Sequence, residues 1–113
     1  MKLYSIASGS SGNSIFIGSE EDSRGILVDT GISKKRIEEG LAAEHITMDH
    51  IQGIFITHEH SDHICGLGPV LRKYAIPVYA TEATIDSILR NGKCGKVDAD
   101  LFQPVRPDVP VNV

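Results

Sequence analysis

The chain has 113 residues, of which 41% are hydrophobic and 23% charged, and its formal net charge is −4. This is the composition of an ordinary globular domain, and it excludes a wholly disordered chain, a collagen-like repeat and a coiled coil. Because the charge balance is acidic, no global charge attracts nucleic acid or an anionic membrane, and any contact with phosphate has to be local.

The first third of the chain predicts three strands. Residues 1–7 form a short strand that ends at the small-residue run 8–12, and residues 15–17 form the second strand. Residues 25–29 form the third, an apolar run that ends in the acid Asp29. Turn residues at this spacing predict an antiparallel meander.

Helices and strands then alternate. The predicted elements are a helix capped by Ser33, a strand over 53–57, a helix over 64–74, a strand over 77–80, and a helix that begins after Thr81 and ends at Asn91-Gly92. The expected buried stripes of these helices are Ile37 and Leu41, then Leu67, Val70 and Leu71, then Ile85, Ile88 and Leu89. This order predicts an α/β fold, of the α+β type, with a mixed β-sheet and flanking helices.

Prolines mark the last stretch of the chain. Pro104, Pro107 and Pro110 recur at every third position and favour an extended edge segment over a helix. Residues 109–113 are typical of the start of a strand.

The two cysteines, Cys65 and Cys94, are too few for a disulfide framework, and neither belongs to a C-x-x-C pair. We expect reduced thiols and a cytoplasmic location. We also expect no membrane association, since no apolar run approaches the ~18 residues of a spanning helix and none at the N-terminus has signal-peptide length.

Three of the five histidines fall within six residues, where the segment 58–63 reads His-Glu-His-Ser-Asp-His directly after a predicted strand. Imidazole nitrogen and carboxylate oxygen are ligands that zinc, iron and manganese accept. His58 and His60 can point the same way in extended or turn backbone, while Asp62 and His63 are offset toward a neighbouring point. The spacing therefore predicts a metal site, with room for two ions roughly 3.5–4 Å apart.

Other catalytic motifs do not fit. The zincin motif H-E-x-x-H is excluded because Asp62 stands three residues after Glu59, and residues 9–12 do not form the G-x-S-x-G nucleophile elbow of serine hydrolases. His45 and His50 are isolated, and we interpret them as ordinary structural histidines.

The run T-H-x-H-x-D-H after a hydrophobic strand resembles the signature of the metallo-β-lactamase fold superfamily of metallohydrolases. The match extends over Ser8–Ser14, Leu27–Gly31 and His58–Gly68, which together resemble the WalJ (YycJ)-like branch of exonucleases and phosphodiesterases. The resemblance implies that residues 1–113 are a single partial domain, the N-terminal half of an αββα sandwich whose second half is absent.

The resemblance also implies roles for individual residues. His58 and His60 would be ligands of the first metal, and Asp62 and His63 of the second, with a catalytic role for Asp62 as well. Asp29 would support the ligand loop by hydrogen bonding; the alternative is an ordinary strand-end aspartate. The implied cofactors are two divalent ions, either zinc or manganese/iron. The implied reaction is attack by a metal-bound hydroxide on a phosphodiester.

The chain departs from the family pattern after His63, since no further histidine follows and no later aspartate stands in a matching motif. One copy therefore cannot complete a two-metal site. Two interpretations follow: a metal-dependent hydrolase acting on nucleic acid, or an inactive half-domain that assembles as an oligomer or needs a complementing second half. We expect a homodimer formed through an exposed sheet face or a strand edge. The loop 8–12 either offers backbone amides to a phosphate or is a plain hairpin connection.

Overall fold

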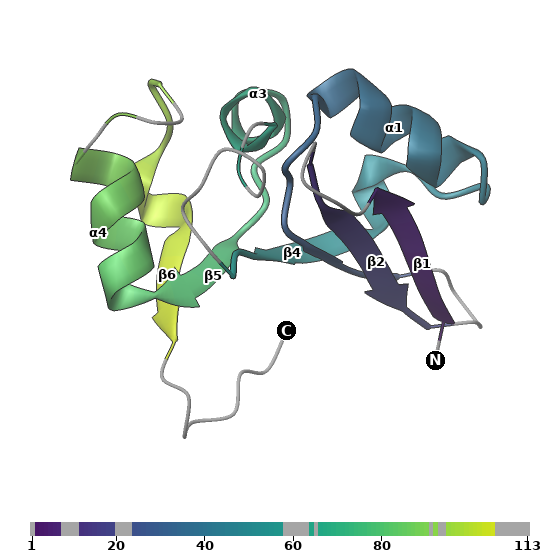
Figure 1. The fold of residues 1–113 in the computed structure, drawn as a ribbon, viewed down its shortest axis with the longest axis horizontal. Helices are drawn as coiled ribbons and strands as arrows, with labels where there is room; N and C mark the ends of the chain where they lie inside the picture. The colour runs from purple at the N-terminus through teal and green to yellow at the C-terminus, as the bar shows by residue number, and fades with distance from the viewer. Residues whose placement is uncertain are drawn as a thin grey trace.

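The structure, a computed structural model, describes residues 2–7, 12–19, 24–57, 64, 66–90, 92 and 95–105. Its centre is one six-stranded sheet in which spatial order equals chain order (Figure 1). The strands are β1 (Lys2–Ala7), β2 (Ser14–Gly18), β3 (Gly25–Val28), β4 (Ile51–Phe55), β5 (Val78–Thr81) and β6 (Phe102–Val105). β1, β2 and β3 pair antiparallel, and β3 to β6 pair parallel. The predicted meander, mixed sheet and α/β class are confirmed.

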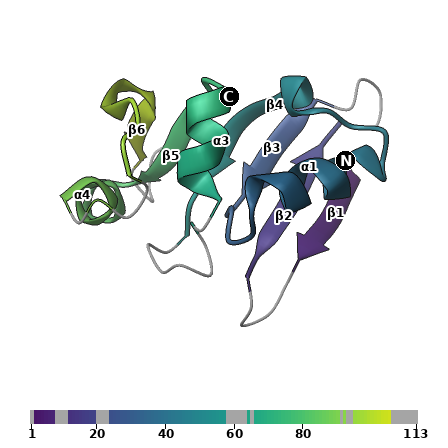
Figure 2. The same cartoon turned by 90° about the horizontal axis from the view of Figure 1, so that it is seen from above.

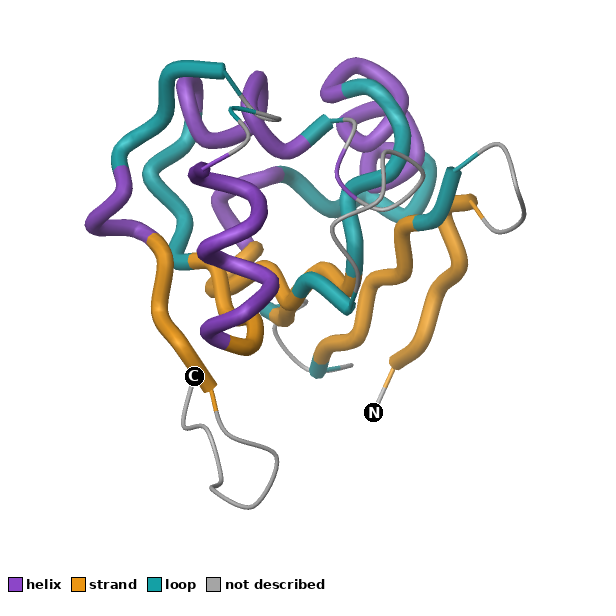
Figure 3. Tube along the Cα trace, turned by 60° about the vertical axis from the view of Figure 1, so that its left-hand side comes forward, coloured by secondary structure: helices purple, strands orange, loops and turns teal. Residues whose placement is uncertain are grey.

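In the described part of the chain, three α-helices lie between these strands: α1 (Lys34–Ala42), α3 (Leu67–Lys73) and α4 (Glu82–Arg90). Short 3-10 turns at Met48–His50 and Ala99–Leu101 precede β4 and β6. Seen from above, α1 and α3 cover one face of the sheet, whereas α4 lies beside β5 and β6 (Figure 2). Figure 3 shows the strands and helices from a third direction. None of the helices in the described part of the chain could cross a membrane.

Local sequence signals explain two of the helices. Ser33 caps α1 as predicted, because its Oγ accepts the amide N–H of Arg36 at 3.2 Å. Thr81 does the same for α4, where its Oγ1 accepts the amide N–H of Thr84 at 3.3 Å. The predicted stripes of α1 and α3 are buried as expected.

The predicted stripe of α4 is wrong at one position. Ile85 and Ile88 are buried, but Leu89 is 39% exposed. The buried side of α4 also includes Thr84, one turn before Ile88, so its centre lies near Ile88. Because residues in a helix are separated by 100°, Leu89 falls outside this arc.

The last predicted segment is confirmed in part. β6 contains Pro104 and is an edge strand, which is where a residue without an amide N–H is tolerated. Residues 109–113, expected to begin a further strand, lie outside the described residues.

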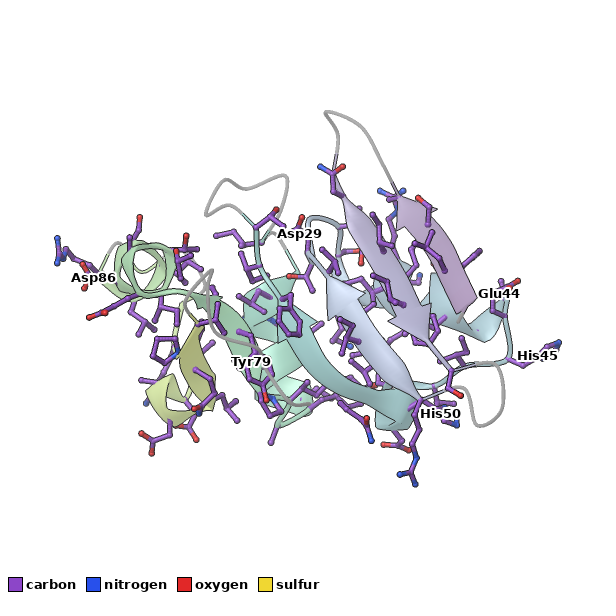
Figure 4. The ribbon with its side chains drawn as sticks, turned by 90° about the horizontal axis from the view of Figure 1, so that it is seen from below. Asp29, Glu44, His45, His50, Tyr79 and Asp86 are labelled. Carbon is purple, nitrogen blue, oxygen red and sulfur yellow. The ribbon has the colours of Figure 1, made fainter. Side chains whose placement is uncertain are left out.

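The two faces of the sheet are unlike. One register row crosses all six strands on the side of α1 and α3, and five of its six residues are buried: Tyr4, Phe16, Leu27, Ile54, Val78 and Phe102. The neighbouring row faces the other way and carries Ile15, Val28, Phe55 and Tyr79, all half-buried. The rings of Phe55 and Tyr79 stack at 4.9 Å. Figure 4 looks at this second face and shows no helix in front of β2, β3 or β4.

An ionic cluster joins α1 to the end of α3. The Tyr74 hydroxyl and the Lys73 Nζ both donate to Oε2 of Glu38, the lysine at 3.2 Å. Lys34 Nζ donates to Oε1 at 3.2 Å. The Tyr74 hydroxyl above all, and then the two lysines, lower the pKa of Glu38 from its ordinary 4.5 to about 2, although partial burial opposes them. The cluster therefore fixes α1, which follows Asp29, against α3, which follows the histidine segment.

We expect Glu38→Gln to lower the free energy of unfolding by about 1 kcal/mol near pH 6, because it removes a charged acceptor shared by three donors. Since the folded pKa is depressed, the stabilisation is complete above pH 4.5 and is lost as the pH falls toward about 2. Urea unfolding at pH 6 and pH 2.5 measures this difference. The matched control is Asp86→Asn, which removes an exposed ion pair within α4 and should change stability by less than about 0.5 kcal/mol. A Glu38→Gln deficit equal at both pH values would contradict the assignment.

Candidate metal centre

The candidate site begins where the parallel strands β3 and β4 end side by side. Val28 is the register partner of Phe55, and the next amide N–H, that of Asp29, donates to the Phe55 carbonyl at 2.7 Å. β4 ends two residues earlier than predicted, so that Ile56 and Thr57 lie beyond it. Because carboxyl ends of parallel strands meet at one edge, Asp29 and Thr57 become neighbours there.

Asp29 uses both carboxylate oxygens on Thr57. Oδ1 accepts the Thr57 amide N–H at 2.8 Å, and Oδ2 accepts the Thr57 hydroxyl at 2.7 Å. Asp29 is 5% exposed and has a left-handed backbone (φ 66°), which aspartate tolerates better than most residues. Figure 4 labels Asp29 at this edge of the sheet. The backbone that enters the histidine segment is thereby bonded to the end of β3.

The residues that follow Asp29 contact two further segments. The carbonyl of Thr30, a fully buried residue, accepts the amide N–H of Gly66 at 2.7 Å. Gly31 donates its own amide N–H to the Asn13 carbonyl at 2.8 Å. The loop 29–32 therefore bonds to chain on both sides of the histidine segment and to the start of β2.

Two glycines allow these close approaches. A Cβ on Gly66 would lie 2.0 Å from the Ile32 carbonyl oxygen, and one on Gly12 would lie 2.4 Å from the Gly31 carbonyl oxygen. Gly12 also has a φ of +143°, which disfavours any residue with a side chain. Both contacts are with backbone, so a small side-chain adjustment could not relieve them.

The predicted ligands lie outside the described residues: His58, His60, Asp62 and His63. The same holds for residues 8–11 of the Gly/Ser loop and for Cys65 and Cys94. Of the predicted site residues the structure describes Asp29 alone. Among the residues that are described, no group of three or more His, Cys, Asp or Glu side chains could bind a metal ion.

His45 and His50 lie elsewhere, after α1 and before β4. The Nδ1 atom of His50 accepts the Thr47 amide N–H at 3.1 Å and so caps a 3-10 turn. His45 is exposed and left-handed, with φ 60°. Both positions agree with an ordinary structural role.

Three contributors to this edge are missing from the sequence-based prediction: Thr57, the Thr30 carbonyl and Gly66. Thr57 carries a signal, because it is a hydroxyl residue at the end of a strand parallel to the one that ends in Asp29. Gly66 carries a weaker one, because a glycine just before a predicted helix is common at turns of many kinds. A backbone carbonyl such as that of Thr30 leaves no trace in the sequence.

Comparison with known proteins gives a consistent picture. A family model described as the metallo-beta-lactamase superfamily matches residues 7–113. The exodeoxyribonuclease YycJ of Bacillus anthracis is 47% identical over 79 residues, 70% of this chain and 29% of that protein. The exodeoxyribonuclease WalJ of Streptococcus pneumoniae is 45% identical over 97 residues, 85% of this chain and 35% of that protein. The chain thus spans about a third of the length of these relatives.

Solved structures resemble this fold. MEM-A1, a subclass B3 metallo-beta-lactamase from a soil metagenome library, superposes with a TM-score of 0.75 at 21% identity over 98% of this chain and 46% of its own. The Rm3 metallo-beta-lactamase gives a TM-score of 0.64 at 24% identity, covering 76% of this chain and 32% of its own. At these identities the likeness concerns the fold.

We expect Asp29→Ala to lower the free energy of unfolding by about 3 kcal/mol, because it removes two hydrogen bonds to a buried carboxylate and places alanine in the left-handed region. Asp29→Gly is the matched variant: it removes the same hydrogen bonds without the backbone penalty and should retain about 1 kcal/mol more. Chemical unfolding of the unmodified protein and the two variants measures the loss of the hydrogen bonds and the backbone penalty separately. A neutral Asp29→Ala would show that these hydrogen bonds are not important for stability.

Proposed function

We propose a function from one premise: this chain belongs to the metallo-beta-lactamase superfamily, whose family model matches residues 7–113. Members of such a family bind divalent metal ions, and we infer that residues 58–63 supply part of a metal site in a metal-dependent hydrolase. The observation that carries the proposal is the pair of hydrogen bonds from Thr57 to Asp29, directly before His58. They restrain the backbone where the segment begins, which is what a preorganised ligand set requires.

The donor set suits the metal. Two imidazoles, His58 and His60, are proposed for one ion, and Asp62 with His63 for a second; zinc, manganese and iron all accept such nitrogen and oxygen donors. A bound ion would supply Lewis-acid charge to a phosphoryl oxygen. In this proposal Asp62 has a catalytic as well as a ligand role, and Asp29 orients the segment through Thr57.

The proposed substrate is DNA, cleaved at a phosphodiester bond. Support comes from the two relatives described as exodeoxyribonucleases, which share 47% and 45% identity with the matched parts of this chain. Since the chain carries a net charge of −4, attraction of a DNA backbone would depend on charge near the metal site rather than on the whole surface.

A second candidate is an inactive half-domain that needs a complementing second half. It is favoured by one observation: every proposed ligand of this chain comes from the short segment 58–63. Neighbouring residues cannot surround an ion, and a closed site would need donors from another segment or another chain.

We propose that residues 1–113 are one partial domain and that two copies associate. The sheet face opposite α1 and α3 carries the half-buried side chains Ile15, Val28, Phe55 and Tyr79, and Leu3 beside them is 67% exposed. An apolar face of this kind favours association, as do β1 and β6, the edge strands of the sheet in the described residues. The cytoplasmic location stays a prediction, based on the two cysteines.

We expect sedimentation at micromolar concentration to give the mass of two chains. Val28→Lys should shift the mass toward one chain, because it puts a charge into the proposed contact. The control is Glu44→Lys, at a position just after α1 and outside the proposed contact row, which should leave the dimer intact. A single-chain mass for the unmodified protein would refute association.

Metal binding and cleavage test the enzyme. We expect the chain to bind Zn²⁺ or Mn²⁺ in calorimetry and to release nucleotides from end-labelled linear duplex DNA. His58→Ala should lower the metal affinity at least about tenfold and abolish cleavage. The control is His45→Asn, which keeps a residue that tolerates the left-handed backbone and should change neither. Binding without cleavage would favour the inactive half-domain. Cleavage that survives in His58→Ala would refute the assigned site.

A further inference from the structure

We infer that Gly66 is a positioning residue for the metal segment: it fixes the chain that leaves residues 58–63 against the loop 29–32, as Asp29 fixes the chain that enters. The inference rests on the proposed metal site. Gly66 has no side chain and acts through its backbone contacts.

The hydrogen bonds of Thr57 and Gly66 both go to the loop 29–32. Thr57 is bonded to the Asp29 carboxylate, and the Gly66 amide N–H is bonded to the carbonyl of the next residue, Thr30. The Cα atoms of Asp29 and Thr30 are ~3.8 Å apart across one planar peptide unit. Thr57 and Gly66, which stand on either side of residues 58–65, are therefore bonded to two adjacent residues of the loop 29–32.

The need for glycine at this position is steric. Gly66 has φ −92° and ψ −2°, a conformation open to other residues, so backbone freedom is not the reason. A Cβ would lie 2.0 Å from the Ile32 carbonyl oxygen and 3.3 Å from the Cδ1 atom of Ile37. Any side chain would push Gly66 away from the loop, and its hydrogen bond to Thr30 would lengthen or break.

The loop 29–32 is also held on its other side, so it cannot easily move together with Gly66. On its other side Gly31 donates to the Asn13 carbonyl, and Gly12 approaches so closely that its own Cβ would be 2.4 Å from the Gly31 oxygen. The loop 29–32 is thus confined between Gly12 and Gly66. A side chain at position 66 would therefore displace Gly66 itself rather than the loop.

The chain offers a matched control. A Cβ on Gly25 would lie 2.2 Å from the Ile17 carbonyl oxygen, also a backbone clash. Gly25 begins β3, whereas Asp29 follows its other end, so the two clashes fall at opposite ends of one strand. Both Gly66→Ala and Gly25→Ala should lower the urea midpoint. Gly66→Ala alone should also weaken Zn²⁺ binding, by 10- to 100-fold in calorimetry.

Equal Zn²⁺ affinities for the two folded variants would overturn the inference and leave the proposed function intact. An unmodified chain that binds neither Zn²⁺ nor Mn²⁺ would instead overturn the proposed metal site and, with it, this inference. The two failures are distinguished by the unmodified protein alone.

A second measurement needs no variant. If the anchors and the metal site are coupled, Zn²⁺ must slow hydrogen exchange at the anchoring amides, because coupling is reciprocal. We expect at least tenfold slower exchange at Gly66 and Thr57. The Ser19 amide, which donates to the Arg24 carbonyl at 2.9 Å in the distant β2–β3 connection, should not change. Slowing at Thr57 without slowing at Gly66 would also overturn the role of Gly66.

Discussion

Two hydrogen bonds from Thr57 stabilise the Asp29 carboxylate in its buried position. The arrangement of this edge of the sheet depends on these two bonds. A buried carboxylate is strongly unfavourable without donors, and the two donors on Thr57 stand 28 positions further along the chain. They are within reach only when β3 and β4 are paired in parallel register. Correct strand pairing and the placement of the residue before His58 are therefore one requirement.

The loop 29–32 is also held by hydrogen bonds to distant segments of the chain. It has no regular secondary structure, yet it bonds to Asn13, Thr57 and Gly66, each from a different segment. Backbone groups make most of these contacts, and two glycines make room for them. Such a loop behaves as part of the rigid core, which is where a binding site gains its precision.

In the described residues, helices bury the side chains on one face of the sheet. Helices α1 and α3 cover the row that runs from Tyr4 to Phe102, whereas the opposite row, with the stacked rings of Phe55 and Tyr79, stays half-buried. Relatives about three times as long match this chain in sequence. Within the described residues, the two faces of this sheet therefore differ in how far their apolar side chains are buried.

The sequence by itself determined the elements and the residue types of the site. Ser33, the stripe of Ile37 and Leu41, and an acid at the end of an apolar strand are local features, fixed by hydrogen bonds and periodicity within a few residues. The spacing of histidines in 58–63 likewise needs no fold to suggest metal ligands. The prediction was wrong at Leu89, because a helical pattern gives the period of a buried stripe but not its centre.

Only the tertiary structure decided which ends meet. Parallel pairing of β3 with β4 brought Asp29 to Thr57, and the same packing brought Gly66 within a hydrogen bond of Thr30. The Gly66–Thr30 contact joins two backbone groups, whose chemistry is the same at every residue, and the donors of Thr57 stand 28 positions from Asp29. No pattern along the chain can therefore specify them until the sheet has formed.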